Sequence, residues 1–528
     1  MRRRLFFSLF CILPLVPVAR SHASAYDGRP RLVVLVVADQ FRADFLEKYR
    51  SRLAPAGLGL LLDKGAVFTN CRFQYAVTRT APGYATLLTG AYSNGHGIGG
   101  NLWWDPEGRR ILAAEEDDNT APLGGGTGGS PHHLLASTLG DELKLATTGQ
   151  SRVFSVALKP RAAILPGGRA ANAAYWIDNT TGAFVSSSYY MDALPQWVLD
   201  FNRGRRAEKY WNLEWKDASG KVLATTRNDG GKGFIGVVGP TPFATDYQLE
   251  FTRELIRQEK LGSGPATDLL ILGLSASDFL GHDVGPDAPE TEAMILAMDR
   301  QLEQFFAFLG RKMGLANVWI ALTADHGIAP LPQSAKGLRL PGTNVDVSDI
   351  RRRVNSALNA RLSPGKRLAY IAATDWPVVY LDARAFAAAN IGQAEAERMV
   401  GELTMRYARW RGFYTRSQME LGQLPADATG RLYANSASSY GGWWLIGQVP
   451  LYSVGVRRGT DHASPFSYDT HVPLVLFGLP FRAGVYRESA EPVDLAPTLA
   501  TLLGITSPSH SVGRVLTEAL APPAGGAP

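Results

Sequence analysis

Residues 31–40 read RLVVLVVADQ, and this stretch decides the fold. Its apolar residues are consecutive and mostly β-branched, which is typical of a strand buried on both faces of a parallel sheet. Similar apolar runs follow at 151–158, 269–274, 318–323 and 473–477. Patterns that favour helices separate most of these runs. We therefore predict an α/β fold, with a mostly parallel central sheet flanked by helices.

The first 25 residues have the three parts of a secretory signal. Three arginines come first, an apolar run over 5–18 follows, and Ala23-Ser24-Ala25 offers a small-residue cleavage site. The apolar run is short for a membrane span, although an uncleaved anchor is the alternative. We predict a signal peptide over 1–25, a catalytic domain over 26–528 and a periplasmic protein without stable membrane insertion.

Charge and cysteine content narrow the possible partners. The chain carries a formal charge of +6, but four arginines lie in residues 1–25, so the mature chain carries +2. This balance gives no sign of a nucleic-acid surface. Of the two cysteines, only Cys71 lies beyond the signal, so the mature monomer has no internal disulfide. A small buried apolar role suits Cys71 best.

Three acids stand at or just after the ends of predicted core strands: Asp39, Asp278 and Asp325. Ligands of open α/β sheets bind at this edge. His282 lies four residues after Asp278, on the same face if that turn is helical, and His326 directly follows Asp325. Carboxylate oxygen with imidazole nitrogen suits zinc. Either Asp–His pair alone is weak evidence, but together they predict a metal site.

A third histidine ligand has two candidates. His462 lies in Gly459-Thr-Asp-His, and His471 comes immediately before the last predicted strand. Spacing alone does not choose between them. The other histidines lie in the signal, in loops or near the C-terminus, where solvent-exposed roles are the simpler interpretation.

The segment TRTAPGYATLLTG, residues 78–90, places a hydroxyl at a predicted helix N-terminus, with Thr80 as N-cap. Free N–H groups and the helix dipole there suit a phosphate or sulfate ester, although a plain N-cap is the simpler alternative. Lys159 and Arg161 lie two apart at a predicted strand end, where alternation would point both to one side. Such cations suit phosphoryl oxygens, and a solvated strand end is the alternative.

These motifs resemble those of the alkaline phosphatase superfamily. The chain is similar in particular to the periplasmic, threonine-nucleophile alkaline phosphatases that carry a Lys-x-Arg motif and lack phosphate repression. The matching segments appear in the family's order and cover nearly all of the mature chain: VVADQ, TRTAPGYATLLTG, Asn101-Leu-Trp-Trp-Asp, Leu158-Lys-Pro-Arg, SDFLGHDVGP, TADHG and GTDHASPFSYDTHVP.

The resemblance implies two zinc ions and a role for each motif residue. One zinc would be surrounded by Asp39, Thr80, Asp325 and His326, and the other by Asp278, His282 and His462. Phosphoryl oxygens would be contacted by Asn101, Lys159 and Arg161. Two positions depart from the family: Ala463 stands where a glycine commonly follows the histidine, which weakens the His462 assignment, and Tyr84 stands where histidine is frequent.

We therefore predict a monomeric zinc-dependent phosphomonoesterase that acts on small phosphate monoesters through a phosphothreonine at Thr80. A phosphodiesterase or nucleotide pyrophosphatase is the nearest alternative, but Lys159 and Arg161 favour the more highly charged monoester. A sulfatase would need a modifiable Cys or Ser at position 80. A cofactor-independent mutase would normally use a serine nucleophile in the cytosol, and an inactive zinc- or phosphate-binding protein is the non-enzymatic alternative.

The pattern changes between residues 330 and 456, where we predict an α+β insertion beside the sheet. It has two expected helices (348–362 and 394–410) and a strand pair near 368–381. Elsewhere we expect helices over 43–63, 134–145 and 494–503, a hairpin around 179–182, and a helix whose apolar stripe runs from Ile295 to Leu309. The chain after Ser507 is expected to be a loose tail.

Overall fold

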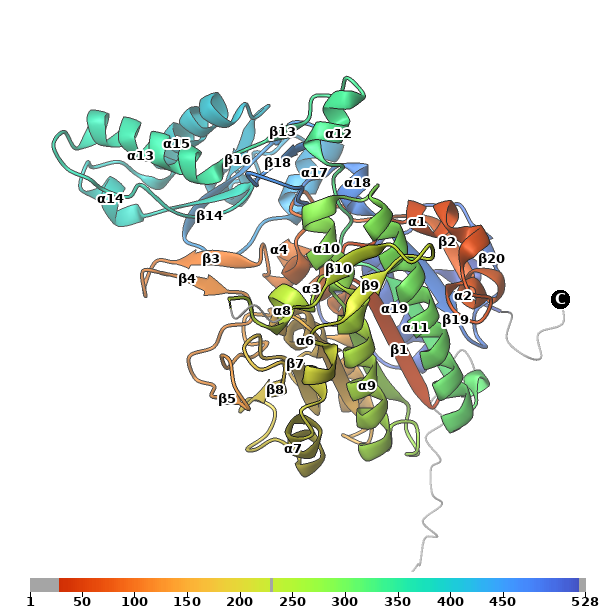
Figure 1. The fold of residues 1–528 in the computed structure, drawn as a ribbon. Coiled ribbons are helices and arrows are strands. Elements are labelled where there is room, and N and C mark those ends of the chain that lie inside the picture. The colour runs from red at the N-terminus through yellow and green to blue at the C-terminus, as the bar shows by residue number, and fades with distance from the viewer. Residues whose placement is uncertain (1–27, 228–230, 522–528) are drawn as a thin grey trace, which may run out of the picture.

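A computed structural model describes residues 28–227 and 231–521. A ten-stranded sheet runs through its centre (Figure 1). Its strands, in spatial order, are β20 (Gly484–Tyr486), β2 (Ala66–Arg72), β19 (His471–Phe477), β12 (Val318–Thr323), β1 (Leu32–Ala38), β11 (Asp268–Leu274), β6 (Val153–Ala157), β7 (Ala173–Ile177), β8 (Phe184–Ser187) and β5 (Pro122–Leu123). The predicted signal peptide lies outside the described residues.

The sheet is mostly parallel, as predicted. The five strands from β12 to β7 pair in parallel, whereas β19 is antiparallel to both β12 and β2. Every residue of β1 is buried, because helices cover both faces of the sheet. The sequence analysis missed β2, whose outer half alternates buried with exposed residues and lacks a continuous apolar run.

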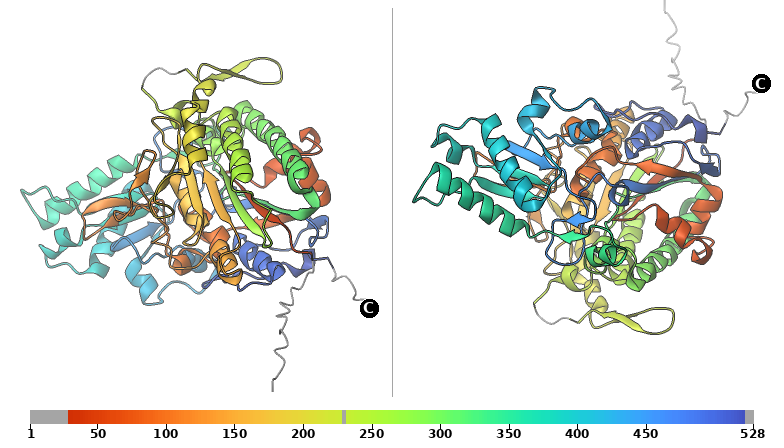
Figure 2. Two further views of the ribbon diagram at one scale, coloured as in Figure 1. Left: turned by 90° about the horizontal axis from the view of Figure 1, so that it is seen from below. Right: turned by 90° about the horizontal axis from the view of Figure 1, so that it is seen from above.

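Two layers of helices enclose the sheet (Figures 1 and 2). One layer holds α2 (Leu58–Lys64), α9 (Pro242–Gln258), α10 (Ala276–Val284) and α11 (Pro289–Met313). The other holds α3 (Thr80–Thr89), α5 (Leu139–Ala146), α6 (Pro160–Gly167) and α19 (Leu495–Leu503). Further helices are α1 (Asp44–Lys48), α4 (Ser93–His96), α7 (Gln196–Arg203), α8 (Phe234–Val237) and α18 (Ser467–Thr470). The apolar stripe of α11, the hairpin of β7 and β8 and helix α19 are confirmed.

The segment predicted as an insertion contains its own four-stranded sheet, in the order β14 (Ile371–Asp375), β15 (Val378–Leu381), β17 (Trp443–Gly447) and β16 (Phe413–Thr415). Its helices are α12 (Pro332–Gly337), α13 (Val347–Leu362), α14 (Ala383–Ala387), α15 (Gln393–Ala408), α16 (Arg416–Glu420) and α17 (Ala428–Asn435). We call this sheet and its helices the inserted sheet. It lies beyond the central sheet, next to the hairpin of β3 (Leu102–Asp105) and β4 (Arg110–Ala113) (Figure 1).

Two helix predictions were wrong in their bounds. The stretch 43–63 breaks after a 3-10 turn at Arg50–Arg52, because Pro55 cannot continue a helix. The stretch 134–145 becomes helical only at Leu139, where Thr138 forms a capping box with Asp141. The two predicted helices of the inserted sheet are confirmed within two residues.

The chain after Ser507 was predicted as a loose tail, and this is wrong for residues up to 521. The N–H of Val512 donates to the Gly90 carbonyl at 2.8 Å, and Leu516 and Ala519 are buried. These contacts hold the C-terminal segment against the end of α3 and against α19. Short, widely spaced apolar residues gave no periodic signal for this packing.

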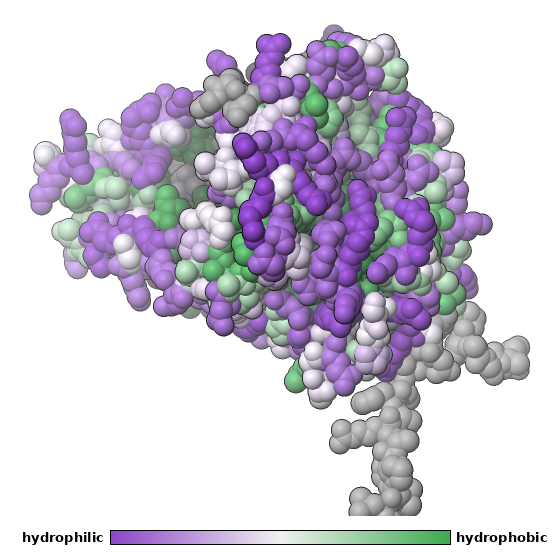
Figure 3. All heavy atoms as spheres, turned by 60° about the horizontal axis from the view of Figure 1, so that its bottom comes forward, coloured by the Kyte–Doolittle hydropathy of each residue, from purple (hydrophilic) through white to green (hydrophobic). Residues whose placement is uncertain are grey.

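Two-stranded sheets complete the structure: β9 (Glu214–Lys216) with β10 (Val222–Thr225), and β13 (Thr343–Asn344) with β18 (Ser453–Val454). Further 3-10 turns lie at Arg206–Tyr210, Leu315–Asn317, Pro492–Asp494 and Thr517–Ala519. Across residues 28–227 and 231–521, no helix combines the length and apolar character of a membrane span. Hydrophilic side chains cover most of the face drawn in Figure 3, with small hydrophobic patches between them.

Candidate metal centre and nucleophile

The three predicted acids meet at one edge of the central sheet. Strands β12, β1 and β11 are neighbours, and their carboxyl ends lie in register. Asp39 directly follows β1, Asp325 lies two residues after β12, and Asp278 sits in the first turn of α10 after β11. Parallel pairing therefore brings carboxylates from distant parts of the sequence together.

One group of ligands is closed to solvent. Asp39, Asp325 and His326 each have no exposed surface, and one ligand atom from each lies within 4.8 Å of the others. His326 Nε2 is 3.6 Å from Asp39 Oδ1 and 3.3 Å from Asp325 Oδ2. We call these three residues the buried cluster.

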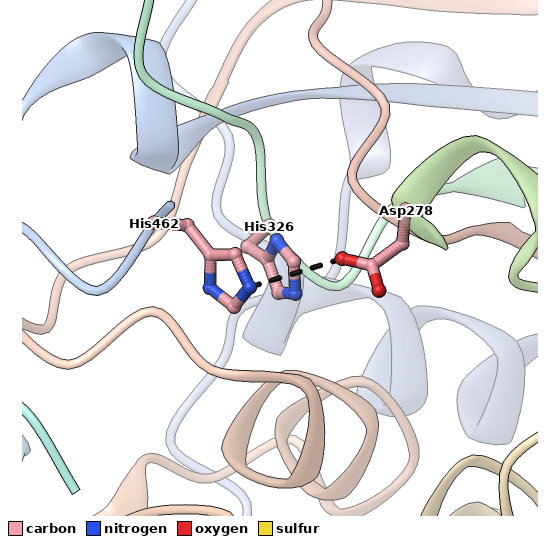
Figure 4. A group of neighbouring side chains, drawn as sticks. All are labelled: Asp278, His326 and His462. Atoms are coloured by element: carbon pink, nitrogen blue, oxygen red, sulfur yellow. Dashed lines mark ion pairs between the residues drawn. The ribbon is translucent and has the colours of Figure 1, made fainter. Parts of the chain in front are cut away.

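A second group lies beside it. Asp278 Oδ1 is 3.3 Å from His282 Nε2 and 3.8 Å from His462 Nε2, and the His282 side chain is 33% exposed. We call Asp278, His282 and His462 the open cluster. The rings of His462 and His326 stack with centroids 3.6 Å apart, and Asp278 points toward them (Figure 4). The two clusters therefore share one site.

All three histidines are oriented as metal ligands are. Their Nδ1 atoms face backbone carbonyls, of Gly327 for His326 (2.9 Å), Thr460 for His282 (3.0 Å) and Thr78 for His462 (2.6 Å). Because a carbonyl only accepts, each Nδ1 donates, so the Nε2 atoms face the carboxylates and are the ones that could bind a metal. Within the described residues, Asp39 Oδ1 and Asp325 Oδ2 are also buried without a hydrogen-bond partner. This set of donors fits metal cations such as zinc.

Lys159 joins the two clusters. Its Nζ donates to Asp39 Oδ2 at 2.7 Å and to Asp278 Oδ2 at 2.5 Å. Burial opposes ionisation of both partners, but the attraction outweighs it, so the pKa of Lys159 is raised and that of Asp278 is lowered well below its usual value. Burial and the neighbouring Asp39 raise the pKa of Asp325 instead.

The three histidines differ in how readily they are protonated. Burial lowers the pKa of His326, and it lowers that of His462 further together with repulsion from His326. Burial also opposes protonation of His282, but Asp278 outweighs it and raises the pKa to about 9. Of the three histidines, His282 therefore holds a proton that a metal would have to displace.

Thr80 stands over the buried cluster. Its Oγ1 is 3.4 Å from His326 Nε2, and the residue is almost fully buried. Thr80 is the first residue of α3, with Arg79 as N-cap, so its prediction as N-cap was wrong by one position. Gly83 lets the helix approach, because a Cβ there would lie 2.3 Å from the Asp325 carbonyl oxygen. The hydroxyl is thus held against the ligands.

The other predicted phosphate contacts approach the same helix end. Asn101 Oδ1 accepts the N–H of Ala81 at 2.8 Å. The prediction that Lys159 and Arg161 alternate at a strand end was wrong, because Pro160 starts α6 and makes Lys159 its N-cap. Arg161 lies in the first turn of α6, which packs against α3, and its buried Nε has no partner within the described residues.

Sequence reasoning left the choice between two histidines open and missed one acid. His471 begins β19 and its Nε2 lies 2.9 Å from the Thr69 carbonyl oxygen, so it belongs to neither cluster. Asp461 approaches His282 and His462 closely enough to be a ligand. However, Asp461 Oδ1 already accepts Arg79 Nη1 at 3.0 Å and the His462 N–H at 2.9 Å, which favours a supporting role. Its place beside His462 was the available signal.

The sequence matches the family described as Type I phosphodiesterase / nucleotide pyrophosphatase over residues 33–404. Alkaline phosphatase PhoV of Synechococcus elongatus is 31% identical over 93% of this chain and 93% of its own length. Alkaline phosphatase PafA of Elizabethkingia meningoseptica is 31% identical over 93% of this chain and 95% of its own. The crystal structure of wild-type alkaline phosphatase PafA has a TM-score of 0.83 at 29% identity, covering 93% of this chain and 99% of that one.

These similarities confirm the resemblance drawn from the motifs and the fold predicted from the strands. The chain belongs to the type I phosphodiesterase / nucleotide pyrophosphatase family, within the alkaline phosphatase superfamily.

Proposed function

We propose that this chain is a zinc-dependent alkaline phosphatase that hydrolyses small phosphate monoesters in the periplasm through a phosphothreonine at Thr80. Curated relatives about 30% identical over most of the chain are named alkaline phosphatases. The observation that carries the proposal is the convergence of three histidine Nε2 atoms and three carboxylates beside one buried threonine hydroxyl.

Two zinc ions fit the donor set. The buried cluster with Thr80 would hold one ion, and the open cluster would hold the other. When bound, they supply Lewis-acid stabilisation of the attacking and the departing oxygen atoms. Metal analysis of purified protein, followed by removal and restoration of zinc, tests this assignment. Full activity after complete metal removal would contradict it.

Thr80 is proposed as the nucleophile. In the first step Oγ1 gives up its proton to water and forms a bond to phosphorus, while the bond from phosphorus to the ester oxygen breaks and that oxygen takes a proton from water to leave as an alcohol. In the second step a water oxygen attacks phosphorus and Thr80 Oγ1 leaves, which releases inorganic phosphate. Acid quenching during turnover should leave phosphate on the peptide that contains Thr80. A Thr80→Ala protein should show neither this adduct nor steady turnover.

The side chains around Thr80 are suited to the phosphoryl oxygens. The Asn101 amide has its oxygen engaged by the Ala81 N–H, so its Nδ2 is the end left to donate to substrate. Lys159 and Arg161 add positive charge at the adjoining N-terminus of α6. Together they would stabilise the charge of the transferring group.

A second candidate, a phosphodiesterase or nucleotide pyrophosphatase, is favoured by the name of the matching family. The two cations argue against it, because a diester carries less charge. Relative turnover of a monoester and a diester decides between them. We expect Arg161→Ala to lower monoester kcat/KM by about 100- to 1000-fold. Diester preference that survives Arg161→Ala would favour the second candidate.

Arg161→Ala is a more specific test of substrate binding than the double variant Lys159→Ala/Arg161→Ala, because Lys159 also pairs with the predicted metal ligands Asp39 and Asp278. The double variant should lose monoester preference as well, but its metal content must be checked.

The proposed periplasmic location rests on the predicted signal peptide over residues 1–25. The mass of the exported protein, with an expected start near Tyr26, tests it. Light scattering tests the proposed monomer.

A further inference from the structure

The inserted sheet reaches the active site through one acid. Asp375 ends β14, is only 8% exposed, and uses Oδ2 to accept the N–H of Asn101 at 2.7 Å and that of Leu102 at 3.2 Å. The fit is close, because a Cβ on Gly100 would lie 2.5 Å from the same Oδ2. From the next strand, Tyr380 Oη donates to the Leu102 carbonyl at 3.2 Å. The inserted sheet therefore holds the backbone of Asn101 and Leu102 through side chains of two adjacent strands.

This contact bears on the direction of the Asn101 side chain. Asp375 holds the Asn101 backbone N–H, while Asn101 Oδ1 accepts the N–H of Ala81, the residue after Thr80. The backbone and the amide oxygen are thus both held in place. The Asn101 Nδ2 is left as the donor for a phosphoryl oxygen beside Thr80.

The same carboxylate also approaches the residue that precedes the nucleophile. Asp375 Oδ1 lies 3.5 Å from Arg79 Nε, and Arg79 immediately precedes Thr80. The guanidinium also donates to Asp461 Oδ1 at 3.0 Å and to the Trp376 carbonyl at 2.6 Å. Arg79 is therefore occupied by the protein itself, and it connects the inserted sheet to the loop that carries His462.

We propose that Asp375 is a positioning residue for phosphoryl transfer, which acts by orienting Asn101. The inference rests on the proposed phosphomonoesterase activity. It gives the inserted sheet a part in catalysis, since a side chain that it contributes orients a group that touches substrate.

Substitution of Asp375 should lower catalysis without removing metal. We expect Asp375→Ala to reduce monoester kcat/KM by about 10- to 100-fold, because a displacement near 1 Å of a positioned group can cost about 100-fold. Asp375→Asn keeps one oxygen for the two N–H groups and should lose less. Gly100→Ala, which keeps the Asp375 carboxylate but adds a Cβ that would displace it, should act in the same direction.

The decisive measurement is the effect of Asp375→Ala in an Asn101→Ala background. If Asp375 acts through Asn101, the second substitution should lower kcat/KM by no more than about 2-fold, because contacting residues in one network are not additive. An equal loss in both backgrounds would overturn the proposal, as would wild-type kcat/KM in Asp375→Ala.

Glu397→Ala is the matched control for damage to the inserted sheet. Glu397 is a fully buried carboxylate of α15 that accepts from Gln393 Nε2 at 2.9 Å and from the Ser417 N–H at 3.0 Å. We expect it to lower Tm while kcat/KM stays at the wild-type value. A loss of kcat/KM equal to that of Asp375→Ala would reduce Asp375 to a merely structural role.

Failure of the proposed function can be told apart from failure of this inference. If wild-type protein with zinc hydrolyses no monoester, the proposed function fails. Calorimetric binding of inorganic phosphate then decides the role of Asp375. Binding weakened by Asp375→Ala only when Asn101 is present would support the positioning role, and unchanged binding would overturn it.

Discussion

The buried cluster and the open cluster use the same chemistry in different surroundings. Asp39, Asp325 and His326 are closed to solvent beneath Thr80, whereas His282 exposes a third of its side chain. Burial lowers the pKa of His326, while Asp278 raises that of His282 to about 9. Under the proposed mechanism, attack would take place at the closed side, and the leaving group would depart at the side that solvent reaches.

Breaking the buried cluster should have the largest effect. We expect Asp325→Asn to lower kcat/KM by about 10,000-fold or more, because Thr80 loses the site that activates it. His282→Asn, in the open cluster, should cost about 10- to 100-fold and recover in excess zinc, since solvent reaches the ligand. Kinetics and metal content of both variants check this, and equal losses with equal recovery would erase the distinction.

Metal removal should make Lys159 essential to stability. Without zinc, Lys159→Met leaves Asp39 and Asp278 buried without their cation, and breaking such a pair costs about 3–5 kcal/mol. Bound zinc would neutralise both carboxylates, so the loss should be much smaller in the metal-loaded protein. Urea unfolding with and without zinc measures the difference. The same loss in both states would show that Lys159 does not substitute for metal charge.

His96 lies outside both clusters and gives a second test of how burial changes the pKa of a histidine. His96 Nδ1 accepts the Ile98 N–H at 3.1 Å, and burial lowers its pKa from 6.5 to about 3. Because the unfolded chain binds this proton first, the contribution of His96 to stability is present above pH 6.5 and is lost as the pH falls toward 3.

His96→Asn retains an acceptor for Ile98 and does not titrate in this range. Its free energy of unfolding should therefore fall less steeply between pH 6 and 4, by up to about 1.4 kcal/mol per pH unit. Denaturation curves of both proteins measure this difference. The titratable groups of the two clusters are the same in both proteins, so their contribution cancels. Parallel pH profiles would mean that His96 is not held neutral.

The smallest expected effect lies beside the open cluster. The backbone of Ala463 adopts a φ of 86°, a conformation that residues other than glycine rarely take. This explains why glycine commonly follows the histidine in the resembled family, and it leaves His462 in place. We expect Ala463→Gly to raise the free energy of unfolding by about 1 kcal/mol with unchanged kcat/KM. A destabilised variant would show that the methyl group packs usefully.

Sequence patterns predicted the parts of the fold that depend on local chemistry. Continuous apolar runs marked β1, β11 and β12, and the acids after them fell at one sheet edge because parallel strands end together. Strand β2 was missed because its half-exposed pattern resembles a loop. The division of residues 330–456 as an insertion stays a prediction.

The sequence could not predict contacts between residues that lie far apart in the chain. Spacing could not separate His462 from His471, since the choice depends on which of them turns its Nε2 toward Asp278. Asp375 and Arg79 had no pattern at all, because their partners come from segments about 300 residues apart in the chain. The metal assignments and the role of Thr80 likewise stay predictions until they are measured.

Because strand β19 comes late in the sequence, the central sheet can be completed only late in synthesis. It lies between β12 and β2, and its His471 pairs with Arg72 near the other end of the chain. A chain that stops before residue 471 leaves both neighbours with open edges, which invite association with other chains. A chain released before residue 462 also lacks one ligand of the open cluster. We therefore expect the enzyme to gain activity only when almost all of it has been made, so partial products would never hydrolyse phosphate esters on their way out of the ribosome.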